Sequence, residues 1–131
     1  MQWTSLWWVG LGGFLGANAR YILSTWVTHR MTAIFGRTIP MGTAFVNITG
    51  SFLLALFIFY VQERFTVSDQ LKWLIGTGFF GAYTTFSTYT NESFVLLQGD
   101  DWLSGWVYII GSNLLCLLGV LFAWWIATHI S

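Results

Sequence analysis

The sequence predicts an all-α membrane protein with four transmembrane helices, and two observations lead to this prediction. Only 8% of its 131 residues are charged, whereas a soluble globular domain carries about 25%. No charge occurs in residues 1–19, 38–62, 73–91 or 102–131, and these stretches hold 93 of the 131 residues. Because a membrane-spanning helix needs about 20 largely apolar residues, residues 1–131 are expected to form a single four-helix domain in a lipid bilayer.

The four predicted helices follow the uncharged stretches in chain order. They cover about Trp3–Leu23, Met41–Val61, Trp73–Leu97 and Trp102–Thr128. A polar link joins the first two helices, a short charged turn joins the second and third, and a Gly-Asp-Asp turn joins the last two. Tryptophans gather near the predicted ends, which is typical of anchors at a membrane interface.

Composition excludes several classes of function. The net charge is zero with only five basic residues, so nucleic acid is not an expected partner. The single cysteine, Cys116, has no disulfide partner within the chain. Four spans leave about 50 residues for connections, and no zinc-spaced cluster, phosphate-binding glycine motif or Ser/His/Asp set occurs among them. The sequence therefore favours transport or a structural role over catalysis.

The basic residues are divided almost equally between the two membrane faces and so predict no clear orientation. Arg20, Arg30 and Arg37 belong to the face of the first and third loops, and Arg64 and Lys72 to the opposite face. Since the excess of basic residues orients a membrane protein, a bias of three against two is nearly neutral. Two interpretations are open: a fixed orientation set by other features, or insertion both ways, which permits an antiparallel homodimer that imitates an inverted repeat.

Small residues on the first span predict close helix contacts. Gly12 and Gly16 are four residues apart, as are Gly13 and Ala17. Such spacing lets two backbones approach closely within a membrane.

The third span carries an unusual run of glycines and hydroxyl residues between Gly76 and Glu92. Glycine costs about 1 kcal/mol in a helix interior, and Ser and Thr side chains compete for backbone hydrogen bonds. We therefore expect the helix to break mid-membrane, near Gly81–Thr85. A broken backbone at membrane depth is tolerated where it is buried in protein or lines a polar cavity. The break is either a structural kink or an ion-related feature of the kind found in transporters.

Beyond the expected break, aromatic and hydroxyl side chains alternate along the helix. Phe86 and Tyr89 are three residues apart and share a face. Hydroxyl residues form neighbouring polar strips at Thr84, Thr88, Ser87 and Thr90. Aromatic ring edges are electropositive, so such a face suits a small anion that accepts strong hydrogen bonds. The alternative is that the aromatic pair only packs.

Three further polar residues are candidates, each with two interpretations. Asn47 either bridges helices or turns its amide to a pore. Glu92 is an intramembrane acid, which indicates function by default, or it reaches the interface from the end of its helix. Arg20 either contacts an ion or, as we favour, caps the first span or pairs with a neighbour. His29 and His129 have no partner in view and receive no role.

Three motifs follow one another along the first three spans. They are Gly12-Gly13-x-x-Gly16-x-x-x-Arg20-Tyr21, Gly42-Thr43-x-x-Val46-Asn47-x-x-Gly50-Ser51 and Gly78-x-x-Gly81-x-x-Thr84-Thr85-Phe86-Ser87-Thr88. With these motifs the chain resembles a known family, the Fluc/CrcB fluoride channels. The resemblance runs from the first span to the fourth, and its Gly-x-x-Thr-Thr-Phe-Ser-Thr core is highly specific.

The resemblance implies an antiparallel, dual-topology homodimer with two fluoride pores and a structural sodium ion on its dyad. Carried over by position, the backbone carbonyls of Gly81 and Thr84 would hold Na⁺, and Arg20 would be structural. The fluoride pathway would comprise Asn47, Phe86, Tyr89, Ser87, Thr88, Thr90, Glu92 and Ser112. Tyr89 departs from the family, which usually has phenylalanine there. Its added hydroxyl could donate to fluoride or alter the constriction, and we expect conduction both with Tyr89 and after Tyr89→Phe.

The sequence-based hypothesis is therefore a passive, multi-pass fluoride channel in a bacterial inner membrane, which lets the cell lose accumulated fluoride without any enzyme activity. A small multidrug antiporter is disfavoured because its coupling requires an acidic residue midway along the first span. Residues 1–19 contain no acidic residue. A potassium-type filter is disfavoured because the stretch Thr77–Gly81 lies inside a span and not on a re-entrant loop. A non-transporting assembly subunit stays as the remaining alternative.

Overall fold

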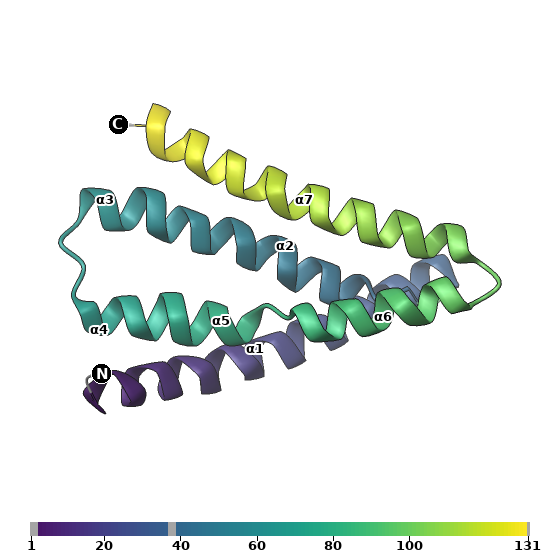
Figure 1. Cartoon of the computed structure of the whole chain (residues 1–131), viewed down its shortest axis with the longest axis horizontal. Coiled ribbons are helices and arrows are strands. Elements are labelled where there is room, and N and C mark those ends of the chain that lie inside the picture. The colour runs from purple at the N-terminus through teal and green to yellow at the C-terminus, as the bar shows by residue number, and fades with distance from the viewer. Residues whose placement is uncertain (1–2, 37–38, 131) are drawn as a thin grey trace.

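The computed structural model describes residues 3–36 and 39–130, and within these ranges the chain is all-helical. Arg37, which was counted in the charge balance, lies outside the described residues. Four helical rods run alternately up and down, with α1 and the rod containing α4 to α6 beside one another (Figure 1). The rod that begins with α2 packs against both α1 and α7.

The rods are built from nine helical segments within the described residues. The first rod is α1 (Trp3–Phe35), and the last is α7 (Trp102–His129). The second rod consists of α2 (Met41–Leu56), the π-helical η1 (Phe57–Val61) and α3 (Gln62–Arg64). The third rod consists of α4 (Asp69–Leu71), the π-helical η2 (Lys72–Phe80), α5 (Gly81–Tyr83) and α6 (Phe86–Gln98).

Helix α1 is longer than the sequence predicts. The predicted span ended at Leu23, but the helix continues to Phe35. No glycine or proline occurs between residues 17 and 35, so nothing in the polar stretch stops the helix. It ends where Gly36 adopts a φ of +65°, the left-handed geometry that commonly closes helices. Arg20 consequently lies in the helix interior and not near its end.

The connections between rods fall at two opposite ends of the molecule. Both chain ends and the α3–α4 connection lie at one end, whereas the α6–α7 connection lies at the other (Figure 1). The comparison of basic residues on the two faces assumed this same up-and-down order.

Glycines bring α1 and η2 into backbone contact. A Cβ added at Gly12 would meet the Leu74 carbonyl oxygen and lie 2.8 Å from the Phe79 nitrogen. From the other side, a Cβ at Gly78 would lie 2.7 Å from the Val9 carbonyl oxygen. The close approach predicted for the Gly12/Gly16 pair is therefore confirmed. Gly13 does not take part, because its added Cβ would be 4.0 Å from the nearest heavy atom.

Two helices of the described chain are long and apolar enough to cross a membrane: Met41–Arg64 with 24 residues and Trp102–His129 with 28. Their apolar side chains are largely exposed in the single chain, including Leu114, Leu118 and Phe122 of α7. Exposed apolar surface on this scale is typical of a protein that contacts lipid or another subunit. The buried core is small and consists of two clusters, one of Val46, Phe80 and Tyr83 and one of Ala44, Tyr89 and Tyr108.

Candidate functional site

The third rod is interrupted between α5 and α6. Thr84 and Thr85 are extended, with ψ of 159° and 119°, and helical geometry resumes at Phe86. The interruption lies inside the stretch 81–85 that the sequence indicates. Thr85 is the N-cap of α6, because its hydroxyl oxygen accepts a hydrogen bond from the Thr88 N–H at 3.3 Å. Such a cap satisfies one of the backbone donors that a helix start leaves without a partner.

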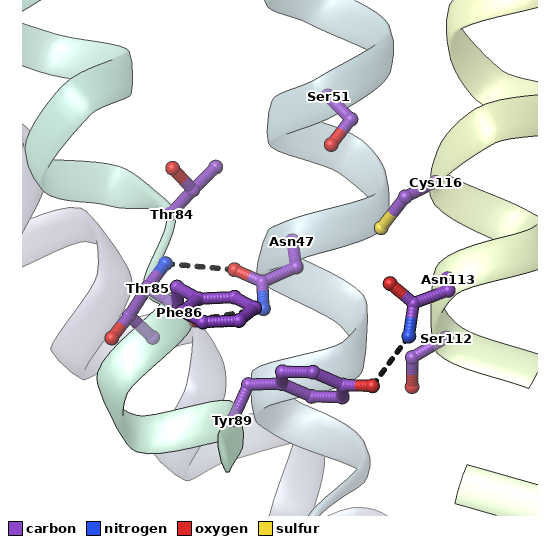
Figure 2. Close-up of a pocket in the computed structure, with 9 residues that line it drawn as sticks. All are labelled: Asn47, Ser51, Thr84, Thr85, Phe86, Tyr89, Ser112, Asn113 and Cys116. Atoms are coloured by element: carbon purple, nitrogen blue, oxygen red, sulfur yellow. Dashed lines mark hydrogen bonds between the residues drawn. The ribbon is translucent and has the colours of Figure 1, made fainter. Parts of the chain in front are cut away.

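The side chain of Asn47 bridges α2 to the interruption (Figure 2). Its Oδ1 accepts from the Thr85 backbone N–H at 2.8 Å, and its Nδ2 donates to the Thr85 carbonyl at 3.0 Å. The amide therefore takes the place of the Gly81 carbonyl as the partner of the Thr85 N–H, and it adds a donor to the Thr85 carbonyl. Asn47 bridges helices, as one of its two interpretations required, and it also borders the pocket described below.

The carbonyls of Gly81 and Thr84 are among those that the interruption leaves without their usual helical donors. In a continuous helix the Gly81 carbonyl would accept from the N–H of Thr85, but that N–H donates to Asn47. The Thr84 carbonyl would accept from the N–H of Thr88, which donates to the Thr85 hydroxyl instead. Both carbonyls that the resemblance assigns to Na⁺ thus lack their usual backbone donors.

A pocket of 210 Å³ lies beside the interruption, between α2, α6 and α7 (Figure 2). All nine described residues that line it are uncharged, and most carry a hydroxyl or amide group. They are Asn47, Ser51, Thr84, Thr85, Phe86, Tyr89, Ser112, Asn113 and Cys116. The N-terminus of α6 faces this pocket, and a helix N-terminus carries a partial positive charge. The pocket therefore offers neutral hydrogen-bond donors and a positive backbone dipole.

The predicted aromatic pair lies at the pocket, but the two rings differ in burial. Their centroids are 5.9 Å apart and their planes are tilted by 44°. Phe86 is 75% exposed in the single chain, whereas Tyr89 is 7% exposed. The Tyr89 hydroxyl donates to the Ile109 carbonyl at 3.2 Å. A phenol has one proton to give, so this hydroxyl does not serve as a donor to an ion in this arrangement.

The other predicted site residues fall into two groups. Ser112 is buried on α7 and borders the pocket. Ser87, Thr88 and Thr90 are exposed on α6 and lie outside the nine lining residues. The Thr88 hydroxyl oxygen accepts from the hydroxyl of Thr85, which does line the pocket, at 3.0 Å.

Glu92 and Arg20, the two charged candidates, both have hydrogen-bond partners within the described chain. The Glu92 carboxylate accepts hydrogen bonds from the hydroxyls of Thr43 and Tyr108, each at 2.9 Å. These two bonds hold it within the bundle, so it does not simply reach outward. The Arg20 guanidinium lies 3.4 Å from the Thr84 carbonyl oxygen. Arg20 therefore pairs with the interrupted backbone, in agreement with the favoured interpretation of a local partner.

Sequence reasoning assigned no part in the pocket to four of the lining residues: Ser51, Thr85, Asn113 and Cys116. Thr85 was part of the expected break, and its role as a cap follows the preference of Thr for N-cap positions. The other three had weaker signals. Cys116 follows Ser112 by four residues and so shares its helix face, and Ser51 stands four residues after Asn47 in the same way. Asn113 carries no comparable signal, because its contact with α6 depends on tertiary packing.

The fold and the site together define a class: a small helical membrane protein whose uncharged polar groups meet at a helix interruption. Comparison with known sequences places the chain more closely, since it belongs to the CrcB family. The model of that family, described as "CrcB-like protein, Camphor Resistance (CrcB)", matches residues 7–124.

Several curated relatives of the chain have the name fluoride-specific ion channel FluC. The protein from Koribacter versatilis is 49% identical over 115 residues, which cover 87% of each chain. The protein from Hahella chejuensis is 45% identical over 112 residues, covering 86% of this chain and 85% of the relative. The protein from Shewanella baltica strain OS185 is 43% identical over 112 residues, covering 86% of each.

Proposed function

We propose that this chain is a passive fluoride channel. The observation that carries the proposal is the pocket at the Thr84–Thr85 interruption, which is lined entirely by uncharged residues. The names of the relatives support the same ion. As a member of this family the chain is a transport protein and not an enzyme.

The chemistry of the pocket suits a small, strongly hydrated anion. Fluoride must exchange its water for other donors to pass a narrow pore. Asn47 uses one amide hydrogen for the Thr85 carbonyl, and an amide nitrogen carries a second, which we assign to the ion. Ring edges of Phe86 and Tyr89 add electropositive surface. A lysine or arginine here would bind the anion more tightly, and conduction requires binding weak enough to permit exit.

The proposed direction of flow is out of a bacterial cell, across its inner membrane. Hydrogen fluoride is a neutral weak acid that crosses membranes and dissociates inside, so the trapped anion needs a pathway out. A bacterium that lacks its own fluoride exporter should grow at higher fluoride concentrations when it expresses this chain. Growth no better than that of cells expressing an Asn47→Asp variant, with both proteins present in the membrane, would contradict the proposal.

We propose that all four rods span the bilayer and that two chains assemble antiparallel. The near-equal basic charge on the two faces and the up-and-down order of the rods support this arrangement. The exposed apolar side chains supply surface for both lipid and a second copy. The dimer would contain two equivalent pores, each using the pocket of one chain.

A structural sodium ion on the dyad is part of this proposal, and the backbone at the interruption fits it. Sodium is a hard cation, and it would take oxygen ligands from the Gly81 and Thr84 carbonyls of each chain. Both carbonyls have lost their helical donors. Arg20 occupies one side of the Thr84 carbonyl, and a carbonyl oxygen has a second lone pair for the ion. The ion would join two interrupted helices and would not be transported.

Sodium is therefore expected to stabilise the purified dimer. A ligand that binds only the folded state raises stability by about 2.7 kcal/mol at a hundredfold excess over its Kd. The midpoint of thermal unfolding should rise with Na⁺ concentration when N-methylglucamine maintains ionic strength. Equal midpoints of thermal unfolding in sodium and in N-methylglucamine would contradict the sodium site. That result would leave the proposed fluoride conduction unaffected.

A further inference from the structure

The side chain of Asn113 joins α7 to the aromatic pair of α6. Its Nδ2 donates to the Tyr89 hydroxyl oxygen at 2.5 Å and to the Ile109 carbonyl at 2.7 Å. The Tyr89 hydroxyl itself donates to the same Ile109 carbonyl at 3.2 Å. Amide, phenol and carbonyl thus form a closed triangle at the side of the pocket. Figure 2 shows the side of it that joins Asn113 to Tyr89.

The triangle determines where the Tyr89 ring lies. The ring stands between Phe86, at 5.9 Å between centroids, and Tyr108, at 5.5 Å. Packing between rings leaves the direction of the ring's long axis adjustable within a side-chain rotamer. Hydrogen bonds to the hydroxyl, which lies at the far end of that axis, fix this direction. A phenylalanine at this position would have no such anchor.

We propose that Asn113 is a positioning residue for the ion pathway. By holding the Tyr89 hydroxyl, it fixes the direction in which that ring extends beside Phe86, and so sets the constriction that fluoride meets. This inference rests on the proposed function. It also accounts for the hydroxyl of Tyr89, whose single proton is given to Ile109 and not to the ion.

The position of Asn113 favours this role over simple pairing of two helices. Its amide already has a local partner in the Ile109 carbonyl, four residues earlier on its own helix. The additional bond goes to a side chain that lines the pocket, and Asn113 lines it as well. Both ends of the contact therefore lie where the ion is proposed to pass.

A double-mutant cycle in reconstituted protein tests the proposal. Fluoride flux and thermal unfolding are measured for wild type, Asn113→Leu, Tyr89→Phe and the double variant. Tyr89→Phe keeps the ring and is expected to conduct. Asn113→Leu should lower flux about fivefold when Tyr89 is present and by less than about twofold in the Tyr89→Phe background, since contacting residues couple by amounts of this size.

A matched control is available on α1. Asn18 also donates to a carbonyl four residues earlier, that of Phe14, and it is exposed and is not among the pocket-lining residues. Asn18→Leu should therefore leave flux within about twofold of wild type, as expected for a distant, independent site. Loss of flux in this variant as large as in Asn113→Leu would mean that the change of residue type, and not the contact with Tyr89, is responsible.

The other outcomes separate the inference from the function on which it rests. Equal losses of flux from Asn113→Leu in both backgrounds would overturn the positioning role. Coupling in thermal unfolding without coupling in flux would show a purely structural contact and would overturn it too. A folded wild type that passes no fluoride would overturn the proposed function, and the unfolding cycle would still report whether Asn113 and Tyr89 interact.

Discussion

Replacing Asn47 by leucine is expected to abolish fluoride flux and to destabilise the fold. The amide makes both hydrogen bonds that hold the Thr85 backbone at the interruption. Leaving a buried partner without its bond costs about 1–3 kcal/mol, and Thr85 would lose two such bonds. The midpoint of thermal unfolding and the rate of fluoride efflux should both fall, measured on protein that elutes as a single folded species.

An aspartate at the same position separates charge from size. Asn47→Asp keeps an acceptor for the Thr85 N–H but adds a negative charge to the pocket. Flux should fall at least about a hundredfold, because like unit charges 4 Å apart repel by about 4 kcal/mol near a protein surface. A folded Asn47→Asp variant that conducts at the wild-type rate would show that the ion does not pass this side chain.

An alanine at Gly16 is expected to prevent normal folding. A Cβ there would overlap the Phe79 carbonyl oxygen and lie 2.9 Å from the carbonyl carbon. Overpacking a core typically costs about 1–3 kcal/mol, and here both obstructing surfaces are helix backbones that cannot rotate away. The yield of monodisperse protein and its unfolding temperature should drop sharply.

Gly10 provides the matched control on the same helix. A Cβ added at Gly10 meets nothing within 4 Å, and alanine improves helix propensity by about 1 kcal/mol over glycine. Gly10→Ala should unfold at or slightly above the wild-type temperature. If Gly16→Ala and Gly10→Ala behaved alike, the backbone contact between α1 and η2 would be refuted.

Local sequence features predicted those parts of the fold that depend on local physics. Uncharged stretches mark the rods because burying a charge in lipid is expensive. The interruption was predictable because glycines and hydroxyl residues weaken a helix wherever they cluster. The extension of α1 to Phe35 was missed for a related reason. Polar residues indicate where a helix leaves the membrane. The helix itself ends only at a residue such as Gly36, whose backbone leaves the helical conformation.

The tertiary partners of the site could not be predicted from spacing alone. The bond between Asn47 and Thr85 joins residues 38 positions apart, and the contact between Arg20 and Thr84 joins residues 64 positions apart. The Tyr89 hydroxyl illustrates the consequence. From sequence it was free to donate to an ion, and in the folded chain α7 places the Ile109 carbonyl and the Asn113 amide against it.

Fluoride efflux from liposomes shows directly whether the chain conducts fluoride. Liposomes containing the purified chain are loaded with potassium fluoride and diluted into sodium buffer, valinomycin carries the counter-current, and a fluoride electrode reads the external solution. A parallel set loaded with chloride serves as the control. We expect rapid release of fluoride without release of chloride. Folded protein that releases no fluoride would show that the chain is not a fluoride channel, and the interrupted helix at Thr84–Thr85 would be left without a function.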